Sequence, residues 1–545
     1  MHAQTAPAVP VTSGAATSDP SPPCPDAEVL VRLGAAAMRA GRTRDAQELL
    51  QRATLLSPAL AAAWHGLAMA LAASGRPSGA FAAISRAVVL APADPAIRLD
   101  QGVLLLRRGL PADAREAFRL AVAAAPDAAL PRLNLGLALL HLTRPAEALE
   151  AFDQALLRDP DLVIAMEARG SALLMLGQPD AADAAYEAVL ARAPDFATAW
   201  SNRGRTLRAL DRPKEALACY EQALVLDPGH VDAHWNRALA LLSEGRLEEA
   251  WGDHEWRWQV RGFPSPRRGF PQPLWQGEDI SGRTILLHAE QGFGDAIQFL
   301  RYVPMVAARG GRVVLEVPAP LLRLAATVGE FATLLARGQT LPPFDLHAPL
   351  LSLPRAFGTD LESIPASVPY LAAGAPDRAR WRARLGAAGG GSRIGLVWAG
   401  NPTHSNDRNR SIPPALLAPL LDLPRLKFFS LQLGPARAAL AEPPLAGRVE
   451  DLAEGLDDFA NTAAALGALD LLVSVDTAVA HLAGALARPV ITLLPHVADW
   501  RWMRNRADTP WYPTMRLVRQ QRRDDWSGAV ASLAAILSHP LTAAA

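Results

Sequence analysis

The sequence predicts an α-helical solenoid followed by two α/β domains with parallel sheets, and three observations lead to this fold class. Prolines recur every 34 residues through the first half of the 545-residue chain. In the second half, short apolar runs alternate with amphipathic segments. A Gly-rich break at residues 387–391 divides those runs into two series, as two successive parallel sheets covered by helices would require.

The repeat in the first half is defined by columns of residues that stay in register over six periods. Four of the columns are proline (Pro58, Pro92, Pro126, Pro160, Pro194, Pro228), alanine (Ala46, Ala80, Ala114, Ala148, Ala182, Ala216), a small residue (Gly34, Ala68, Gly102, Gly136, Gly170, Gly204) and a large apolar residue (Leu50, Ile84, Phe118, Phe152, Tyr186, Tyr220). We expect two short helices per unit, which cross at the small residues and end at the proline. The pattern resembles the tetratricopeptide repeat, with six full units and a partial seventh over residues 27–260.

One further column of the repeat carries amides on the first helix of three units. Its members are Asn134, Asn202 and Asn236. The resemblance implies a superhelix with a concave groove, in which these amides would bond the backbone of an extended protein or peptide ligand. The alternative is that they are solvated helix positions, because the same column holds Asp100 and Ala168 in other units.

The second half follows a Trp- and Pro-rich joint at residues 261–283. Strands are predicted at "TILLHA", "GRVVLEV" and "FDLHAPL" in a first domain (284–386), and at "RIGLVWAG", "LKFFSLQL", "DLLVSVD", "PVITLLP" and "MRLVRQ" in a second domain (392–540). Open α/β sheets bind ligands outside the carboxyl ends of their strands. We therefore expect the chemistry in a cleft between those ends.

The loop after the first predicted strand reads "HAEQGFGDAIQF", a strand that stops at glycines and reopens as a helix. It lacks the Lys-Ser/Thr pair of a phosphate loop. It also lacks the third glycine of a dinucleotide loop, because Gly292 and Gly294 are followed by Ile297. Asp295 is either a functional carboxylate or a cap of the helix that follows.

Two loops of the second domain carry groups suited to an anion. In "SVDTAVAHLAG", Asp476 or Thr477 can cap a helix whose free N–H groups point toward the cleft, and His481 lies one turn further on. The other loop, "GLVWAGNPTHSNDRNR", offers Asn401 and the cation Arg410, with Arg408 close by. This geometry is compatible with a diphosphate, although Asp476 and His481 could also be a turn residue and a buried histidine without a ligand.

These two motifs give the second half a specific resemblance. "GFGDAIQFLRYVP" and "SVDTAVAHLAGALARPV" are similar to the two signature loops of glycosyltransferase family nine, the heptosyltransferases, although Ala478 replaces the expected glycine. The similarity spans about residues 284–540. The order of domains also resembles the O-linked N-acetylglucosamine transferases and the flagellin glycosyltransferases.

The resemblance implies a GT-B fold of two Rossmann-like halves and an inverting transfer from a nucleotide sugar. It implies that Asp295 is the base, that Gly292 and Gly294 line the acceptor side, and that the donor diphosphate lies among the remaining candidates (Asn401, Arg410, Asp476, Thr477, His481). No Asp-x-Asp motif stands in the second half, so we expect neither a metal nor another cofactor. The repeats favour a protein acceptor. The alternative function is an interaction scaffold whose transferase domain is inactive.

Composition excludes several other classes. The formal net charge is zero, which argues against a nucleic-acid partner. No apolar stretch is long enough for a membrane span. Cys24 and Cys219 are the only cysteines, which fits a cytoplasmic protein without disulfides. Residues 1–26 are predicted to be a disordered tail, because they are rich in Ala, Pro, Ser and Thr.

Overall fold

The computed structural model describes residues 24–386, 391–404 and 406–539. Most of the predicted tail at 1–26, and most of the Gly-rich break at 387–391, lie outside these ranges. The chain forms two compact units, one up to Pro194 and one from Asp195 onward. The division falls inside the predicted repeat region (27–260), so the last repeats belong to the same unit as the two sheets.

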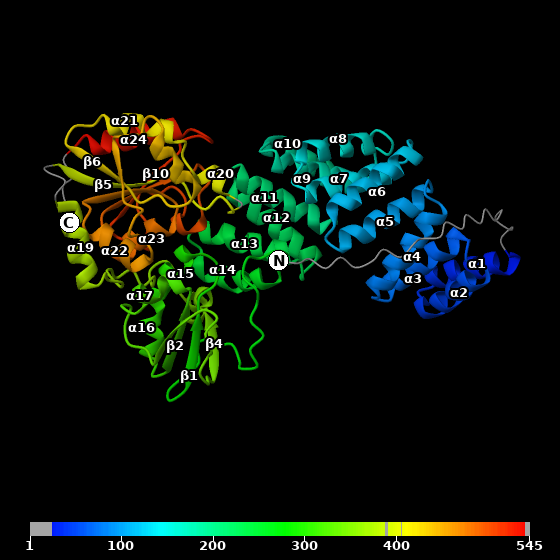
Figure 1. The fold of residues 1–545 in the computed structure, drawn as a ribbon, viewed down its shortest axis with the longest axis horizontal. Helices are drawn as coiled ribbons and strands as arrows, with labels where there is room; N and C mark the ends of the chain where they lie inside the picture. Colours follow the sequence, from blue (N-terminus) through cyan, green and yellow to red (C-terminus); the bar gives the residue numbers. More distant parts are fainter. Residues whose placement is uncertain (1–23, 387–390, 405, 540–545) are drawn as a thin grey trace, which may run out of the picture. The chain divides into compact units, whose positions relative to one another are not determined.

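The repeats are helix pairs, as predicted. The first unit holds α1 (Pro25–Arg39), α2 (Thr43–Leu56), α3 (Ala61–Ala73), α4 (Pro77–Leu90), α5 (Pro95–Arg107), α6 (Pro111–Ala124), α7 (Ala129–His141), α8 (Pro145–Leu156), α9 (Val163–Met175) and α10 (Pro179–Arg192). The second begins with α11 (Ala197–Ala209), α12 (Pro213–Leu226), α13 (Val231–Ser243) and α14 (Leu247–His254). Figure 1 colours this series from blue to green. The seventh pair, α13 and α14, is complete but ends in a short helix.

The small and large columns of the repeat pack directly on each other. A β-carbon at Gly136 would lie 2.4 Å from a ring carbon of Phe152, and one at Gly102 would lie 2.4 Å from Phe118. The aromatic side chains of both pairs are fully buried. The unit with Ala68 instead of glycine has the smaller Ile84 in the large column. Close packing of the two helices therefore explains why the first of these columns holds only small residues.

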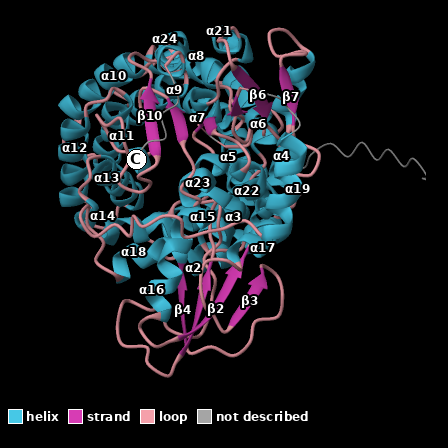
Figure 2. Cartoon of the chain, turned by 90° about the vertical axis from the view of Figure 1, so that its left-hand side faces the viewer, coloured by secondary structure: helices cyan, strands magenta, loops and turns pink. Residues whose placement is uncertain are grey.

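The second unit also contains two separate, wholly parallel sheets. The first has the order β3-β2-β1-β4, from β1 (Thr284–His288), β2 (Arg312–Val317), β3 (Thr333–Ala336) and β4 (Leu346–Pro349). The second has the order β10-β9-β8-β5-β6-β7, from β5 (Ser392–Val397), β6 (Leu426–Ser430), β7 (Val449–Asp451), β8 (Leu471–Val475), β9 (Val490–Leu494) and β10 (Met515–Arg519). Figure 2 shows β2, β3 and β4 in one sheet and β6, β7 and β10 in the other. The predicted parallel sheets are confirmed.

Helices cover both sheets. Those of the first half are α15 (Phe293–Phe299), α16 (Val303–Ala307), α17 (Leu322–Ala325) and α18 (Leu353–Ala356). Those of the second half are α19 (Ala375–Gly386), α20 (Asp407–Arg410), α21 (Ala418–Leu421), α22 (Phe459–Gly467), α23 (Ala478–Ala485) and α24 (Trp526–Leu537). Short 3-10 turns complete the connections, among them η1 (Glu255–Gln259) and η7 (Trp500–Trp502).

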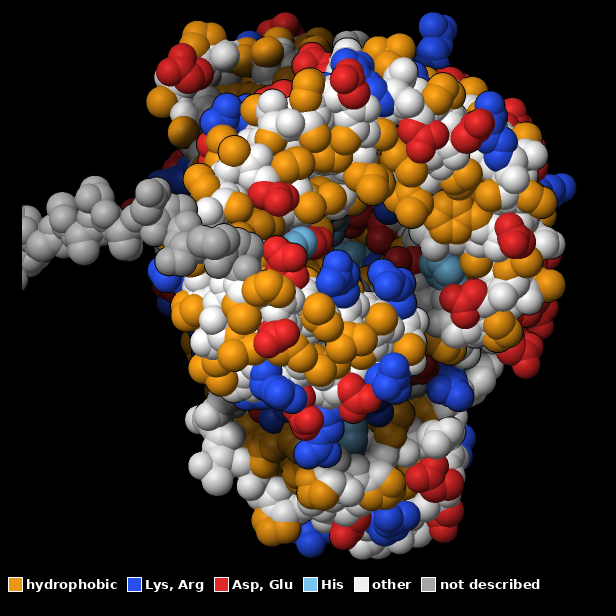
Figure 3. Space-filling model, turned by 90° about the vertical axis from the view of Figure 1, so that its right-hand side faces the viewer, with side chains coloured by type: hydrophobic (Ala, Val, Ile, Leu, Met, Phe, Trp, Pro, Cys, Tyr) orange, Lys and Arg blue, Asp and Glu red, His pale blue; other side chains and the backbone are white. Residues whose placement is uncertain are grey.

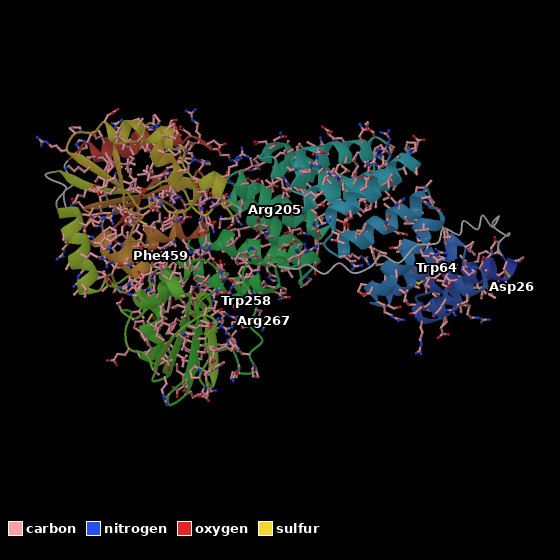
Figure 4. All side chains as sticks on the ribbon, in the orientation of Figure 1. Asp26, Trp64, Arg205, Trp258, Arg267 and Phe459 are labelled. Carbon is pink, nitrogen blue, oxygen red and sulfur yellow. The ribbon has the colours of Figure 1, made fainter. Side chains whose placement is uncertain are left out.

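The joint at 261–283 and the segment before it are built into the first half. The backbone N–H of Trp275 donates to the carbonyl of His347 on β4 at 2.8 Å, and the indole of Trp275 is buried. Just before the joint, the buried guanidinium of Arg257 binds Glu290 at 2.8 Å and stacks over the ring of Trp258, which Figure 4 labels. This ion pair supports the loop that follows β1.

Candidate functional site

The strand orders locate the ligand-binding edges. Counted along the chain, the second sheet has the order 3-2-1-4-5-6 of doubly wound nucleotide-binding sheets, so its strand order reverses between β5 and β8. The first sheet reverses between β1 and β4. The loops after β1, β5 and β8, together with the first turns of the helices that follow them, contain every predicted donor and catalytic residue (Gly292, Gly294, Asp295; Asn401, Arg410; Asp476, Thr477, His481). These residues follow the carboxyl ends of the strands, where open sheets bind ligands.

The two edges meet at the glycine turn. A β-carbon at Gly294 would lie 2.9 Å from Cδ2 of His481 and 3.4 Å from Cα of Ala478. The loop after β1 therefore packs directly on the first turns of α23. Glycine is required at position 294 because the other half of the molecule leaves no room for a side chain. The sequence alone could not supply this reason.

Asp295 has both carboxylate oxygens engaged. Oδ2 accepts the backbone N–H of Gly292 at 2.8 Å, which closes the first turn of α15. Oδ1 is bonded to the guanidinium of Arg501 in the second half. About one fifth of the Asp295 side chain (19%) stays accessible. Asp295 thus has the bond to the helix start that the cap interpretation requires, and it also pairs with a cation of the second half.

His481 is buried between aromatic side chains. Its Nδ1 lies 3.0 Å from the hydroxyl of Tyr512, and its ring stacks on Trp502 with the centroids 4.9 Å apart. Burial, together with the charges of Arg501 and Arg301, holds the pKa of His481 well below its usual range. The imidazole is therefore neutral at physiological pH. In the tautomer with the proton on Nε2, it is a hydrogen-bond donor beside Gly294.

Asp476 lies next to His481, with Oδ1 4.0 Å from Nε2 of the imidazole. Burial and the charge of Asp499 raise the pKa of Asp476 to about 6. Thr477 occupies the position before α23, but its side chain does not cap the helix, contrary to one of the predicted arrangements. The hydroxyl is bonded to Ser474 at 2.9 Å instead. The first N–H groups of α23 therefore remain without a side-chain cap, with the positive end of the helix dipole beside them.

The loop after β5 separates its two arginines. Arg410 is half-buried, bonded to Asp407 at 3.2 Å and packed on Gly400, whereas Arg408 is exposed. Asn401 is exposed, and its side-chain oxygen accepts from the backbone N–H of Thr403 at 3.1 Å. Of the two predicted cations, Arg410 therefore has the side chain that the loop holds in a defined position. Asn401 stabilises the turn of the loop.

Sequence reasoning missed the residue that joins the two halves, Arg501. Its guanidinium donates to Gln298 at 2.8 Å and to Asp499 at 2.9 Å, in addition to Asp295. Burial alone would lower its pKa, but the carboxylates of Asp295 and Asp499 raise the pKa above the usual value. Arg301 joins the halves in the opposite direction: it belongs to the first half and donates to the carbonyl of Trp511 in the second half at 2.8 Å.

Arg501 stands in the segment "DWRWM", whose two tryptophans are core residues. Trp502 is fully buried and Trp500 is 5% exposed. The guanidinium of Arg501 lies 4.4 Å from the ring of Trp500. Phe293 of the first half contacts Phe459 of the second half with the ring centroids 5.1 Å apart; Figure 4 labels Phe459.

The three amides of the repeat column lie on α7, α11 and α13, and all three are partly buried. The side-chain nitrogen of Asn134 donates to the carbonyl of Leu130 in its own helix at 2.9 Å. The side-chain oxygen of Asn236 accepts from Arg208 at 3.5 Å. A peptide ligand for this column, Asn202 included, remains a prediction.

The described ranges lack two other kinds of binding feature. No group of three or more His, Cys, Asp or Glu side chains there could hold a metal ion. None of the described helices combines the length and apolarity needed to cross a membrane. On the face shown in Figure 3, acidic and basic side chains are intermixed among apolar ones.

Comparison with known proteins confirms the two predicted parts at the level of their families. The tetratricopeptide repeat family matches residues 31–95, 99–163, 167–216 and 202–254, so the chain contains such repeats. Glycosyltransferase family 9 (heptosyltransferase) matches residues 451–522. This stretch includes Asp476, His481 and Arg501, whereas Asp295 and Arg410 lie outside it.

One curated relative and several solved structures are similar to part of this chain. Protein FlbA of Caulobacter vibrioides is 28% identical over 326 residues, which cover 54% of this chain and 52% of that protein. The chain thus spans about half the length of this relative. A tetratricopeptide repeat protein from Parabacteroides merdae is 18% identical, with a TM-score of 0.38, over 42% of this chain and 91% of its own. The repeat protein TTC0263 of Thermus thermophilus is 27% identical, with a TM-score of 0.30, over 33% and 97%.

Proposed function

We propose that the two-sheet half is a glycosyltransferase that moves a sugar from a nucleotide-sugar donor to a protein acceptor, by inverting displacement and without a metal ion. The match of residues 451–522 to glycosyltransferase family 9 supports the reaction class. Two parallel sheets whose carboxyl edges meet fit the expected GT-B arrangement. The repeats support a protein acceptor, since repeats of this kind present extended binding surfaces.

One observation carries the proposal. The loop after β1 brings a carboxylate, Asp295, to the place where α23 and its neighbours present hydrogen-bond donors and cations, and Gly294 contacts His481 at this junction. Glycosyl transfer needs both kinds of group. The attacking hydroxyl must lose a proton, and the departing diphosphate must have its growing negative charge stabilised.

The donor diphosphate is assigned to the second half. The N–H groups at the start of α23 have no side-chain cap, and a helix N-terminus with free donors favours an anion. Neutral His481 would donate through Nε2, and Arg410 would contribute a charge-assisted hydrogen bond. Thr477 and Asp476 position the turn. In this assignment, protein cations and helix N–H groups take the place of a metal ion.

The acceptor hydroxyl is assigned to Asp295. A carboxylate offers about four lone-pair directions, and the bonds to Gly292 and Arg501 use two of them. The accessible part of the side chain can therefore still accept the proton of a hydroxyl or of water. Arg501 orients the carboxylate. Gly292 and Gly294 place this group next to the donor side.

The engagement of both Asp295 oxygens is also the observation that favours the second candidate, a scaffold with an inactive transferase domain. A carboxylate held only for structure would show the same two bonds. Donor turnover separates the two functions, because a scaffold would bind a nucleotide sugar without releasing the diphosphate.

The test is a panel of nucleotide sugars. Thermal melting should show stabilisation by a donor that binds the folded state, since such a ligand at about 100 times its Kd contributes ~2.7 kcal/mol. Release of nucleoside diphosphate from that donor, with EDTA present, would support the enzyme. Binding without release would support the scaffold, and a panel without any stabilising sugar would contradict both assignments of this cleft.

A further inference from the structure

A cavity of about 380 Å³ lies between the last repeats and the second sheet. All of its lining residues belong to the unit that starts at Asp195. Its walls come from the end of α11 and the turn after it, from the loop that follows β9, and from the end of β10. They do not include Asp295, Asp476 or His481. The cavity lies at the carboxyl ends of β9 and β10, the edge at which parallel sheets bind ligands.

Four arginines line this cavity, and two of them form ion pairs with carboxylates. Arg504 binds both oxygens of Asp211, at 2.9 and 2.8 Å, and Glu244 at 2.9 Å. Arg506 is paired with Asp508 at 2.8 Å. These ion pairs hold the repeats and the loop after β9 in place and leave little charge for a ligand.

The other two, Arg208 and Arg519, have only neutral hydrogen-bond partners. Arg519 donates to the backbone carbonyls of Trp502 at 2.5 Å and Met503 at 2.6 Å. Burial lowers the pKa of Arg519 to about 10, so its guanidinium is still protonated at neutral pH. Arg208 donates to the side-chain oxygen of Asn236 at 3.5 Å. Neither guanidinium forms an ion pair with a carboxylate of the described residues, although the charge of Asp211 acts on Arg519 and opposes the effect of burial on its pKa.

An amide donor in the same wall also lacks a partner. Gln520 is 4% exposed, and its side-chain oxygen accepts the backbone N–H of His496 at 3.0 Å. Its Nε2 is buried and makes no hydrogen bond with the described residues. A buried donor without an acceptor costs about 1–3 kcal/mol. Two guanidinium groups without an ion pair, together with an unpaired amide donor, require an occupant rich in acceptor atoms.

We propose that this cavity is an anion site that binds a phosphate or carboxylate group among Arg208, Arg519 and Gln520. Its volume falls within the range of about 300–1,000 Å³ for small-molecule sites. The loop that lines it continues into Asp499 and Arg501, so an occupant would contact the back of the segment that reaches Asp295. The site is distinct from the donor cleft and does not depend on the function proposed above.

The experiment is calorimetric titration of the full chain with inorganic phosphate and, separately, with malonate, to distinguish the two anion classes. Arg208→Gln and Gln520→Leu should each weaken binding at least about tenfold, as the loss of a charge-assisted or buried hydrogen bond predicts. The matched control is Arg205→Gln, which removes the same charge from an exposed position on α11, labelled in Figure 4. Its affinity should equal that of the wild type.

The variant Arg410→Gln distinguishes binding in this cavity from binding at the donor site. The donor site would also bind phosphate if the proposed function holds. Binding that survives Arg410→Gln and is lost in Arg208→Gln supports the proposal. Binding lost in Arg410→Gln but kept in Arg208→Gln would place the anion in the donor cleft and overturn it. Failure of both anions to bind the wild type would overturn it as well. Arg208 is half-buried at the surface, so its variant tests the site even where Gln520→Leu fails to fold.

Discussion

Arg410 and Arg408 are two residues apart in the loop after β5, yet the structure gives them different environments. Arg410 is half-buried and oriented by Asp407, whereas Arg408 is exposed. If Arg410 binds the donor diphosphate, Arg410→Gln should weaken the binding of a nucleoside diphosphate by about 1.5–3 kcal/mol. Arg408→Gln removes the same charge and should have little effect. Equal losses in calorimetry would show that only the overall charge of the loop matters.

Asp476 should leave a pH signature on stability. Its pKa is about 6 in the folded protein and 3.8 ordinarily, so between these values the folded state binds more protons than the unfolded state. The protonated carboxyl therefore makes its full contribution to the free energy of unfolding below about pH 4. This contribution, up to about 3 kcal/mol, is lost as the pH rises through about 6. Urea unfolding from pH 4 to 7 should show this loss relative to Asp476→Asn. Parallel pH profiles for the two proteins would refute the shift.

At the scale of elements, a repeat glycine offers a direct stability test. Gly136→Ala would place a β-carbon 2.4 Å from the ring of Phe152, which forces the helices of that unit apart. We expect a loss of about 1–3 kcal/mol from overpacking. Gly79→Ala is the matched control, because its nearest neighbour, Leu71, lies at an ordinary 3.4 Å. Denaturation midpoints of the two variants should differ, and identical midpoints would argue against close packing at this column.

The periodic elements could be predicted from the sequence because their signals are local. The repeat columns and the buried apolar strands are of this kind. Two short strands, β3 and β7, were missed, since the first is half-exposed throughout and the second has three residues. The contacts of Arg501 and Gly294 could not be predicted, because their partners lie about 200 residues away in the chain. The positions of Asp295 and His481 followed from motifs, but the approach of His481 to the glycine turn did not.

At the scale of the whole molecule, the boundary between the compact units determines which truncation is informative. Arg504 is paired with Asp211, between α11 and α12, and the indole of Trp251 donates to the carbonyl of Thr359 at 2.7 Å. A protein that starts at Asp195 should therefore keep its donor affinity. It should lose transfer to a protein acceptor if the earlier repeats recruit that acceptor.

A cut at residue 230 removes Asp211 and should lower the melting temperature of the remainder. Donor titration and melting of the two truncated proteins check this prediction. Full transfer activity in the protein that starts at Asp195 would show that the first repeats do not select the acceptor.

The most direct test of the account is single-turnover release of nucleoside diphosphate by Asp295→Asn, compared with Asp499→Asn. Both variants remove a carboxylate from Arg501, but only the first removes the proposed base. We predict that Asp295→Asn slows release about 10²–10⁴-fold at unchanged donor affinity, while Asp499→Asn has a much smaller effect. Near-normal release by Asp295→Asn, or an equal loss in both variants, would contradict it and leave Asp295 as a structural partner of Arg501.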